Sequence, residues 1–239
     1  MQQAVHTTYA VWLGLTDYRQ ALDLQTKVCE LKKRGFREDV LILLEHPPTI
    51  TLGRNADRDH LLASDDVLKA RGVSLFAVDR GGDVTFHGPG QLVGYPILQL
   101  ERTERDVHRL MRNLEESLIR LLSSYGVKAG REEHLTGVWT PKGKIAALGI
   151  HISRWITRHG FALNVNTDLS YYSMIVPCGI LGKPVTSMES LLECRFELEE
   201  IAVRYAGEFG EVFNRHVVRI SAAEFQQKLL GYAHEIAVA

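Results

Sequence analysis

The sequence predicts an α+β fold, in which helices flank a mixed sheet. Helical periodicity and short β-rich apolar segments alternate irregularly, without the strand–helix–strand repeat of a doubly wound sheet. The second half of the chain changes to a two-residue alternation, which is typical of antiparallel pairing. The 239 residues are 45% hydrophobic, enough to bury a sizeable core. The sequence has no repeat and no Pro/Ser-rich linker, so we expect a single domain over residues 1–239.

The first half alternates helical and extended segments. Residues 18–34 carry apolar side chains at helical spacing and stop at Gly35, which predicts a helix. Two strands follow at 40–46 and 49–54, and a proline pair separates them. The remaining predicted elements are a helix at about 58–70, a strand at 74–79, a strand at 92–100 and a helix at 103–124.

The second half is predicted to contain a hairpin and a helical end. Apolar residues alternate over 148–152 and again over 161–165, with TRHG (157–160) as the expected turn. Amphipathic helical patterns return near 197–213 and 222–232. We expect these to form a small helical C-terminal portion, from about residue 197, packed on the sheet.

Composition excludes several classes of partner and cofactor. Twenty-eight basic and 29 acidic residues give a formal charge of -1, so no global field attracts nucleic acid or an anionic membrane. The longest apolar run, Val40 to Leu44, is far too short to cross a bilayer, and the N-terminal residues lack a signal-peptide pattern. Three widely spaced cysteines with no CxxC pair argue against disulfides and zinc. We therefore expect a cytoplasmic protein without metal or cofactor.

The stretch RGGDVTFHGPGQ, from Arg80 to Gln91, is the first candidate site. Neither GxxxxGK[ST] nor GxGxxG occurs in it, so it is not a phosphate loop. Its glycines expose backbone N–H groups beside the cation of Arg80 and the polar tips of His87 and Gln91. This set suits an extended ligand with a carbonyl or amide. A decorated turn between two strands is the alternative.

Cys178 is the candidate nucleophile among the three cysteines. It lies between a proline and a glycine in IVPCGILGKPVTS, where a loop could present its sulfur. Cys29 lies in the first predicted helix and Cys194 in LLECRF, and we expect both to be packing residues. An ordinary buried thiol remains the alternative for Cys178.

A cysteine nucleophile needs a nearby cation or base that favours its thiolate. Lys144 opens the apolar run KIAALGI and is the candidate. The alternative is a solvated lysine in the turn TPKGK, which for a lysine is the commoner case.

Several segments together resemble the octanoyltransferases of lipoate biosynthesis, also called the lipoate-protein ligase B family. They lie in the right order between Arg80 and Ser187, and HPPTITLGR nearer the N-terminus is also similar. No motif beyond about residue 195 matches. The matching segments are RGGDVTFHGPGQLVGYPI, GKIAALGIHI, HGFALNV, VPCGI and PVTS.

The resemblance implies a fold related to the catalytic domains of biotin protein ligases and lipoate ligases. It also implies that Cys178 takes an octanoyl group from octanoyl-acyl carrier protein as a thioester. Lys144 would favour the thiolate and shuttle the proton, with His87 as a less favoured base. The residues that would line the acyl and pantetheine site are Arg80, Gly81, Gly82, Asp83, Val84, Thr85, Phe86, His87, Ala147, Leu148, Gly149, Gly160, Phe161 and Ala162.

The resemblance further implies the acceptor. The octanoyl group would pass to a specific lysine of the lipoyl domains of 2-oxoacid dehydrogenase complexes and of the glycine cleavage H protein, as the first step of endogenous protein lipoylation. Transfer from a thioester to an amide is downhill, so no ATP is required. Two alternatives stay open: an ATP-dependent lipoate or biotin protein ligase of the same superfamily, and a non-catalytic acyl or carrier-binding module.

Overall fold

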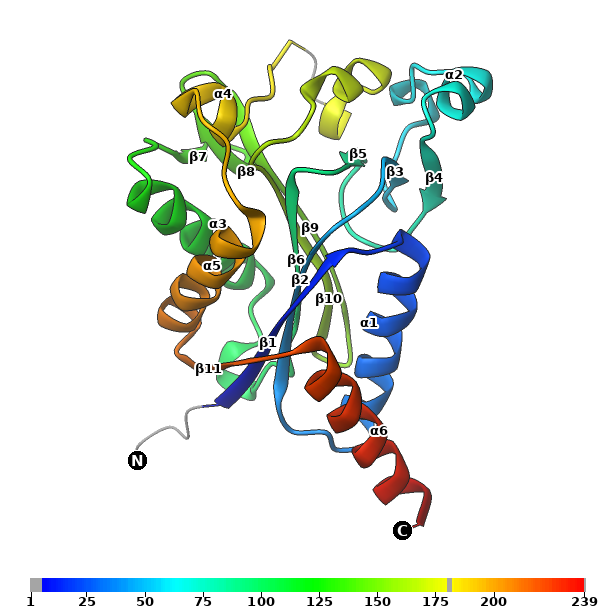
Figure 1. Cartoon of the computed structure of the whole chain (residues 1–239), viewed down its shortest axis with the longest axis vertical. Helices are drawn as coiled ribbons and strands as arrows, with labels where there is room; N and C mark the ends of the chain where they lie inside the picture. The colour runs from blue at the N-terminus through cyan, green and yellow to red at the C-terminus, as the bar shows by residue number, and fades with distance from the viewer. Residues whose placement is uncertain (1–5, 180–181, 239) are drawn as a thin grey trace.

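The computed structural model describes residues 6–179 and 182–238, and its centre is a mixed eight-stranded sheet (Figure 1). The strands of this sheet are β1 (His6–Leu15), β2 (Asp39–Glu45), β6 (Gln91–Ile97), β7 (Gly130–Glu132), β8 (Leu135–Thr140), β9 (Gly143–Ser153), β10 (Ile156–Asn164) and β11 (Arg215–Ile220). They lie in the order β11-β1-β2-β6-β10-β9-β8-β7. β1 pairs in parallel with β2 and β11, whereas β2, β6, β10 and β9 pair antiparallel.

A smaller sheet lies beside one end of the large one. It contains β3 (Thr49–Leu52), β4 (Ser74–Ala77) and β5 (Val84–His87), in the order β4-β3-β5. β5 falls inside the glycine-rich stretch, which was expected to be a loop. The sequence does not indicate this strand, because it has only four residues and lies in a stretch rich in glycine.

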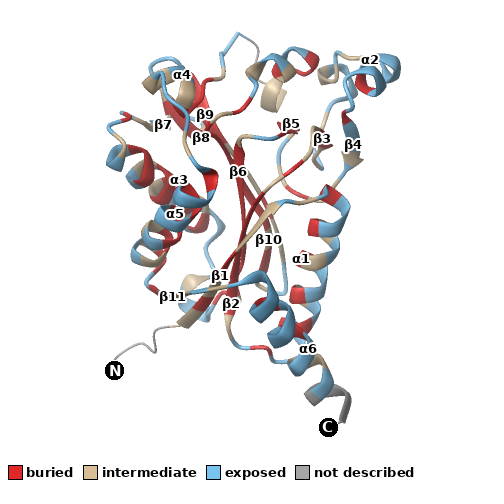
Figure 2. Ribbon diagram, viewed as in Figure 1, coloured by how far each residue is buried: buried red, intermediate tan, exposed pale blue. Residues whose placement is uncertain are grey.

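Helices cover both faces of the large sheet (Figure 1). α3 (Val107–Ser124) and α5 (Leu198–Phe213) lie on one face, and α1 (Tyr18–Lys33) and α6 (Ala222–Val238) on the other. The strands between them are mostly buried, as Figure 2 shows. The shorter helices are α2 (Asp65–Ala70), α4 (Met188–Leu192), η1 (Arg58–His60), η2 (Arg102–Glu104), η3 (Leu169–Met174) and η4 (Pro177–Gly179).

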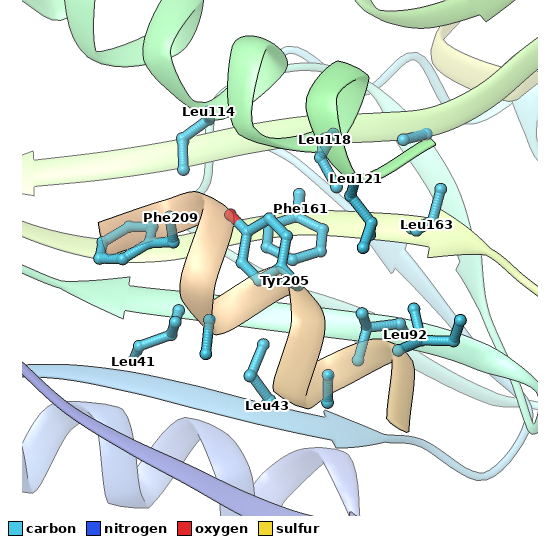
Figure 3. Packing of buried hydrophobic residues seen from close by; sticks show 14 of the residues in the cluster. Leu41, Leu43, Leu92, Leu114, Leu118, Leu121, Phe161, Leu163, Tyr205 and Phe209 are labelled. Atoms are coloured by element: carbon cyan, nitrogen blue, oxygen red, sulfur yellow. The ribbon is translucent and has the colours of Figure 1, made fainter. Parts of the chain in front are cut away.

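Three hydrophobic clusters hold these layers together. In the α3/α5 core, Leu114 and Leu118 of α3 meet Tyr205 of α5 and Phe161 of β10, whose ring centroid lies 4.5 Å from that of Tyr205 (Figure 3). The α1/α6 core includes Val28 and packs on the opposite face. A third cluster joins the small sheet to η3. Burial of these large side chains is the main favourable term in folding.

Several predicted elements are confirmed, including α1, β2, β6 and the helix ending at Ser124. The helix predicted at 58–70 is divided into η1 and α2. TRHG is not the hairpin turn, because it lies within β10, and the chain reverses instead at Arg154 and Trp155. Both turn residues have positive φ, 52° and 62°, which matches the twist of a two-residue hairpin.

The C-terminal segment differs from the small helical portion that was expected. β11 separates α5 from α6 and extends the large sheet beside β1. The two helices therefore lie on opposite faces. Within residues 6–179 and 182–238, every helix is too short or too polar to span a bilayer.

Candidate active site

A cavity of about 250 Å³ lies where the two sheets meet. Its wall combines side chains from β5, β9 and β10 with the start of α1 and the η4 turn. Both candidate catalytic residues, Lys144 and Cys178, line it. The other lining residues are Tyr18, Arg80, Gly82, Asp83, Thr85, His87, Tyr95, His134, Leu135, Thr136, Ala147, Leu148, Gly149, His159, Gly160, Phe161 and Ala162.

Cys178 is presented on a tight turn. Its φ of 56° and ψ of 20° are left-handed, and Gly179 follows with a φ of 67°. The N–H of Val176 donates to the carbonyl of His60 at 2.8 Å, which ties the turn to η1. A Cβ on Gly179 would lie 2.5 Å from Oδ2 of Asp83, and together with the positive φ this close approach favours glycine there. The turn thus holds the half-buried sulfur at the cavity.

Lys144 meets this sulfur directly, because its Nζ donates to Sγ of Cys178 at 3.0 Å. The lysine is only 6% exposed, so it is not the solvated turn lysine considered as an alternative. Its backbone N–H donates to Pro184 O, and its carbonyl accepts from the N–H of Thr186, each at 2.9 Å. A buried ammonium is costly without a partner, and Sγ supplies an acceptor that can carry negative charge.

β5 divides its four side chains between the cavity and the third core. Thr85 and His87 line the cavity, whereas Val84 and Phe86 are buried with the aromatic residues of η3. The N–H of Gly81 donates to the carbonyl of Ile150 at 2.9 Å, and Gly81 does not line the cavity. The structure therefore places Gly81, Val84 and Phe86 outside the wall to which they were assigned.

His87 has a fixed tautomer. Its Nδ1 lies 2.9 Å from Oε1 of Gln91. The Gln91 amide is oriented by its Nε2, which donates to the carbonyl of Phe86 at 3.1 Å and to Oδ1 of Asn164 at 3.0 Å. Nδ1 of His87 therefore carries the hydrogen, and Nε2 is left as an acceptor. Burial lowers the pKa of His87 well below its usual value, so the ring is neutral at pH 7.

Arg80 is built into the wall as a cation. Its Nη2 donates to the carbonyl of Thr51 at 2.8 Å and to Oγ1 of Thr51 at 2.9 Å, and its Nη1 donates to the carbonyl of Gly81 at 3.1 Å. Burial lowers the pKa of its guanidinium, yet an arginine in a protein stays protonated. These contacts fix a positive charge beside the cavity.

Small residues on β9 and β10 form the opposite wall. A Cβ on Gly149 would lie 2.7 Å from the carbonyl oxygen of Gly81, so the backbones approach closely there. Ala147 and Ala162 add only methyl groups. Leu148 and Phe161 also line the cavity, although the side chain of Phe161 belongs to the α3/α5 core (Figure 3) and Leu148 packs against that core.

Six residues that line the cavity were not among the predicted site residues. His159 could have been predicted, because it is the first residue of the matching segment HGFALNV, from which only Gly160, Phe161 and Ala162 were chosen. Tyr18 comes from the distant start of α1 and has no local signal. Burial lowers the pKa of His159 to about 4 and raises that of Tyr18 to about 12. The other four are Tyr95, His134, Leu135 and Thr136.

The other cysteines lie away from this cavity. Cys29 is half-buried on α1, and its Sγ donates to the carbonyl of Thr157 at 3.9 Å. Cys194 is exposed, so the prediction that it packs was wrong. The part of the chain that the structure describes contains no group of three or more His, Cys, Asp or Glu side chains suited to a metal ion.

Comparison with known proteins gives the family. Residues 17–210 match the lipoyl protein ligase A/B catalytic domain. A curated octanoyltransferase from Solibacter usitatus is 54% identical over 202 residues, covering 84% of this chain and 91% of the relative. The chain belongs to the octanoyltransferase family. An octanoyltransferase from Koribacter versatilis is 52% identical over 211 residues, covering 86% and 84%. The family predicted from the sequence segments is confirmed.

Solved structures confirm the predicted fold class. A putative lipoate protein ligase from T. acidophilum with bound lipoic acid has a TM-score of 0.71 at 16% identity, covering 93% of this chain and 92% of its own. A lipoate-protein ligase A bound with ATP has a TM-score of 0.74 at 15% identity, covering 97% and 94%. Biotin protein ligase from Aquifex aeolicus gives 0.53 at 12%, covering 86% and 70%. These likenesses concern the fold alone.

Proposed function

We propose that this octanoyltransferase moves an octanoyl group from octanoyl-acyl carrier protein, through a thioester on Cys178, to a specific lysine of a lipoyl domain. The observation that carries the proposal is the 3.0 Å contact between Nζ of Lys144 and Sγ of Cys178, at the wall of the cavity. A nucleophile with a proton-carrying group in hydrogen-bond reach is the arrangement that covalent acyl transfer requires.

In the first half-reaction, the Cys178 thiolate attacks the carbonyl carbon of the octanoyl thioester. The tetrahedral intermediate collapses, the bond to the pantetheine sulfur breaks, and the octanoyl group remains on Sγ. The ammonium of Lys144 gives a proton to the departing thiolate and becomes a neutral amine. The fixed cation of Arg80 lowers the cost of negative charge near the cavity.

In the second half-reaction, a neutral lysine amine of the acceptor attacks the acyl-cysteine. Its nitrogen forms the amide bond, the bond to Sγ breaks, and the amine of Lys144 accepts the surplus proton. The Cys178 thiolate and the Lys144 ammonium are thereby restored. Neutral His87, with an acceptor at Nε2, is the second group that could take this proton.

The shape of the cavity supports an acyl ligand. The small side chains of Ala147 and Ala162 leave room for an extended alkyl chain against β9 and β10. The proposed acceptors are the lipoyl domains of 2-oxoacid dehydrogenase complexes and of the glycine cleavage H protein, reached in the cytoplasm. The proposed reaction uses no ATP, because a thioester already activates the acyl group.

Intact mass spectrometry tests this proposal most directly. After incubation with octanoyl-acyl carrier protein, the wild type should gain one octanoyl group and Cys178→Ala should gain none. Cys29→Ala and Cys194→Ala are the matched controls and should keep transfer within about threefold, because both thiols lie outside the cavity. Octanoyl transfer to a lipoyl domain by Cys178→Ala would reject the covalent route, and ATP-dependent release of pyrophosphate would support the ligase alternative.

A further inference from the structure

Lys144 reaches the cavity because β9 contains a bulge. Val138 of β8 pairs with Ala146, but the next residue, Trp139, pairs with Lys144, so Ile145 is an extra residue in β9. Side chains alternate along a regular strand, which would turn Lys144 and Ala147 to opposite faces. The extra residue shifts the alternation by one and brings both side chains to the cavity.

Gly137 of β8 has no side chain, and the side chain of Lys144 occupies the space where one would lie. A Cβ at this position would lie 2.5 Å from Cε of Lys144 and 2.8 Å from the carbonyl oxygen of Ala146. The φ of Gly137 is 132°, a backbone angle that residues other than glycine rarely adopt. The lysine stem therefore crosses directly over the backbone of Gly137.

The backbone of Gly137 needs an anchor outside the sheet. The ladders with β7 and β9 are both irregular here, and among the described residues neither gives Gly137 a register partner. Its N–H donates instead to Oε1 of Glu115, on α3, at 3.1 Å. A buried N–H left without an acceptor would cost about 1–3 kcal/mol.

Glu115 is unusual because it is a carboxylate with only 1% of its surface exposed. Its Oε2 accepts from Arg112 at 2.7 Å and from Arg131 at 3.1 Å, while Oε1 is left for Gly137. A buried carboxyl group loses its hydration, and hydrogen bonds from such partners compensate for that loss. The two arginines therefore hold the side chain of Glu115 in place at the irregular part of β8.

We propose that Glu115 is a positioning residue for the transfer reaction: it holds Gly137 where the Lys144 ammonium can cross β8 and meet Cys178. This inference rests on the proposed function, because it assigns a purpose to the Lys144–Cys178 contact. The competing explanation is that Glu115 only fastens α3 to the sheet. That explanation predicts a loss of stability alone, whereas positioning also changes the reactivity of Cys178.

The test is Glu115→Gln in the full chain, which keeps the size of the side chain and replaces one carboxylate oxygen with an NH2 donor. The remaining oxygen is drawn to Arg112 and Arg131, so the N–H of Gly137 faces a donor and loses its acceptor. The rate of Cys178 alkylation by iodoacetamide is followed against pH, with the labelled peptide identified by mass spectrometry. The charged and titratable groups around Cys178 are unchanged in this variant. They are Lys144 from β9, Arg80 and Asp83 from the segment before β5, His87 from β5, His60 from η1, Tyr172 from η3 and His134 between β7 and β8.

Positioning predicts a kinetic signature. The midpoint of alkylation should rise by about 0.5–1 pH unit, because a displaced ammonium stabilises the thiolate less. The kcat for octanoyl transfer should fall about 10- to 100-fold while KM for the carrier protein stays within about twofold. Gly137→Ala should move both quantities in the same directions, since its methyl group would push Cε of Lys144 aside.

Glu116→Gln is the matched control. Glu116 is the next residue of α3 and accepts from the same Arg131, at 2.8 Å, but its other partner is Arg120 at 3.2 Å rather than Gly137. Its alkylation profile and kcat should equal those of the wild type. A folded Glu115→Gln with the wild-type profile and kcat overturns the proposal, as does an equal shift in Glu116→Gln. If Glu115→Gln does not fold, an unshifted Gly137→Ala overturns it.

The Lys144→Met variant distinguishes a failure of the positioning role of Glu115 from a failure of the proposed function. If Lys144→Met reacts with iodoacetamide as the wild type does, the proposed Lys144–Cys178 partnership itself is wrong. If Lys144→Met shifts and Glu115→Gln does not, only the positioning role fails.

Discussion

His46 should make the stability of this protein depend on pH. It lies directly after β2 with no exposed surface. Its Nδ1 donates to the carbonyl of Thr16 at 2.6 Å, and its Nε2 accepts from the hydroxyl of Tyr95 at 2.7 Å. Both hydrogen bonds suit the neutral ring, and burial lowers the pKa of His46 to about 4.

The sign follows from the difference in bound protons. In the unfolded chain a histidine has a pKa of about 6.5. Between pH 6.5 and about 4, the unfolded chain binds a proton at His46 that the folded protein does not, so the free energy of unfolding falls as the pH falls. The contribution is fully present well above pH 6.5 and is lost as the pH falls toward 4. The two pKa values give a loss of about 0.2 kcal/mol at pH 7 and about 2 kcal/mol at pH 5.

The measurement is urea unfolding at pH 7 and pH 5 for the wild type and His46→Gln. Glutamine offers a donor and an acceptor but does not titrate. The wild type should lose about 2 kcal/mol more than the variant between the two pH values. His216→Gln, on the exposed side of β11, is the control and should follow the wild type. Equal losses in the wild type and His46→Gln would refute the reasoning.

Two further predictions concern packing and thiol reactivity. Gly160→Ala should lower the free energy of unfolding by about 3 kcal/mol in urea, because its Cβ would overlap the carbonyl oxygen of Gly94, while Gly207→Ala on α5 meets open space and should not destabilise. Iodoacetamide at pH 8 should label Cys194 before Cys29 in peptide mass spectra, because Cys194 is exposed and burial raises the pKa of Cys29. Faster labelling of Cys29 would contradict this.

Sequence periodicity predicted the elements whose determinants are local. α1 and α3 repeat apolar residues over several turns, and each is recognisable without its partners. β1 and β11 are different, because their pairing joins His6 to Arg215 across almost the whole chain. Residues 215–220 read RHVVRI, with too few apolar positions to predict a strand alone.

The composition of the site was predictable, but its geometry was not. The segments around Lys144 and Cys178 were singled out from the sequence, and the structure brings the two side chains together. The direction of each neighbouring side chain depends on strand alternation inside the glycine-rich stretch, which separates Thr85 and His87 from Val84 and Phe86. A single extra residue in β9 decides that Lys144 faces the cavity, and such a bulge leaves no composition signal.

The division of α5 and α6 between the two faces of the sheet bears on how the protein is made. A nascent chain that ends at residue 197 has α3 and α1 to cover the two faces only in part, because Tyr205 and Phe209 complete one core and Phe225 the other. The edge of β1 that pairs with β11 also stays open until β11 has been synthesised. Both cores are therefore complete only once residue 229 has been synthesised, and until then the uncovered apolar surface and the open edge of β1 favour aggregation.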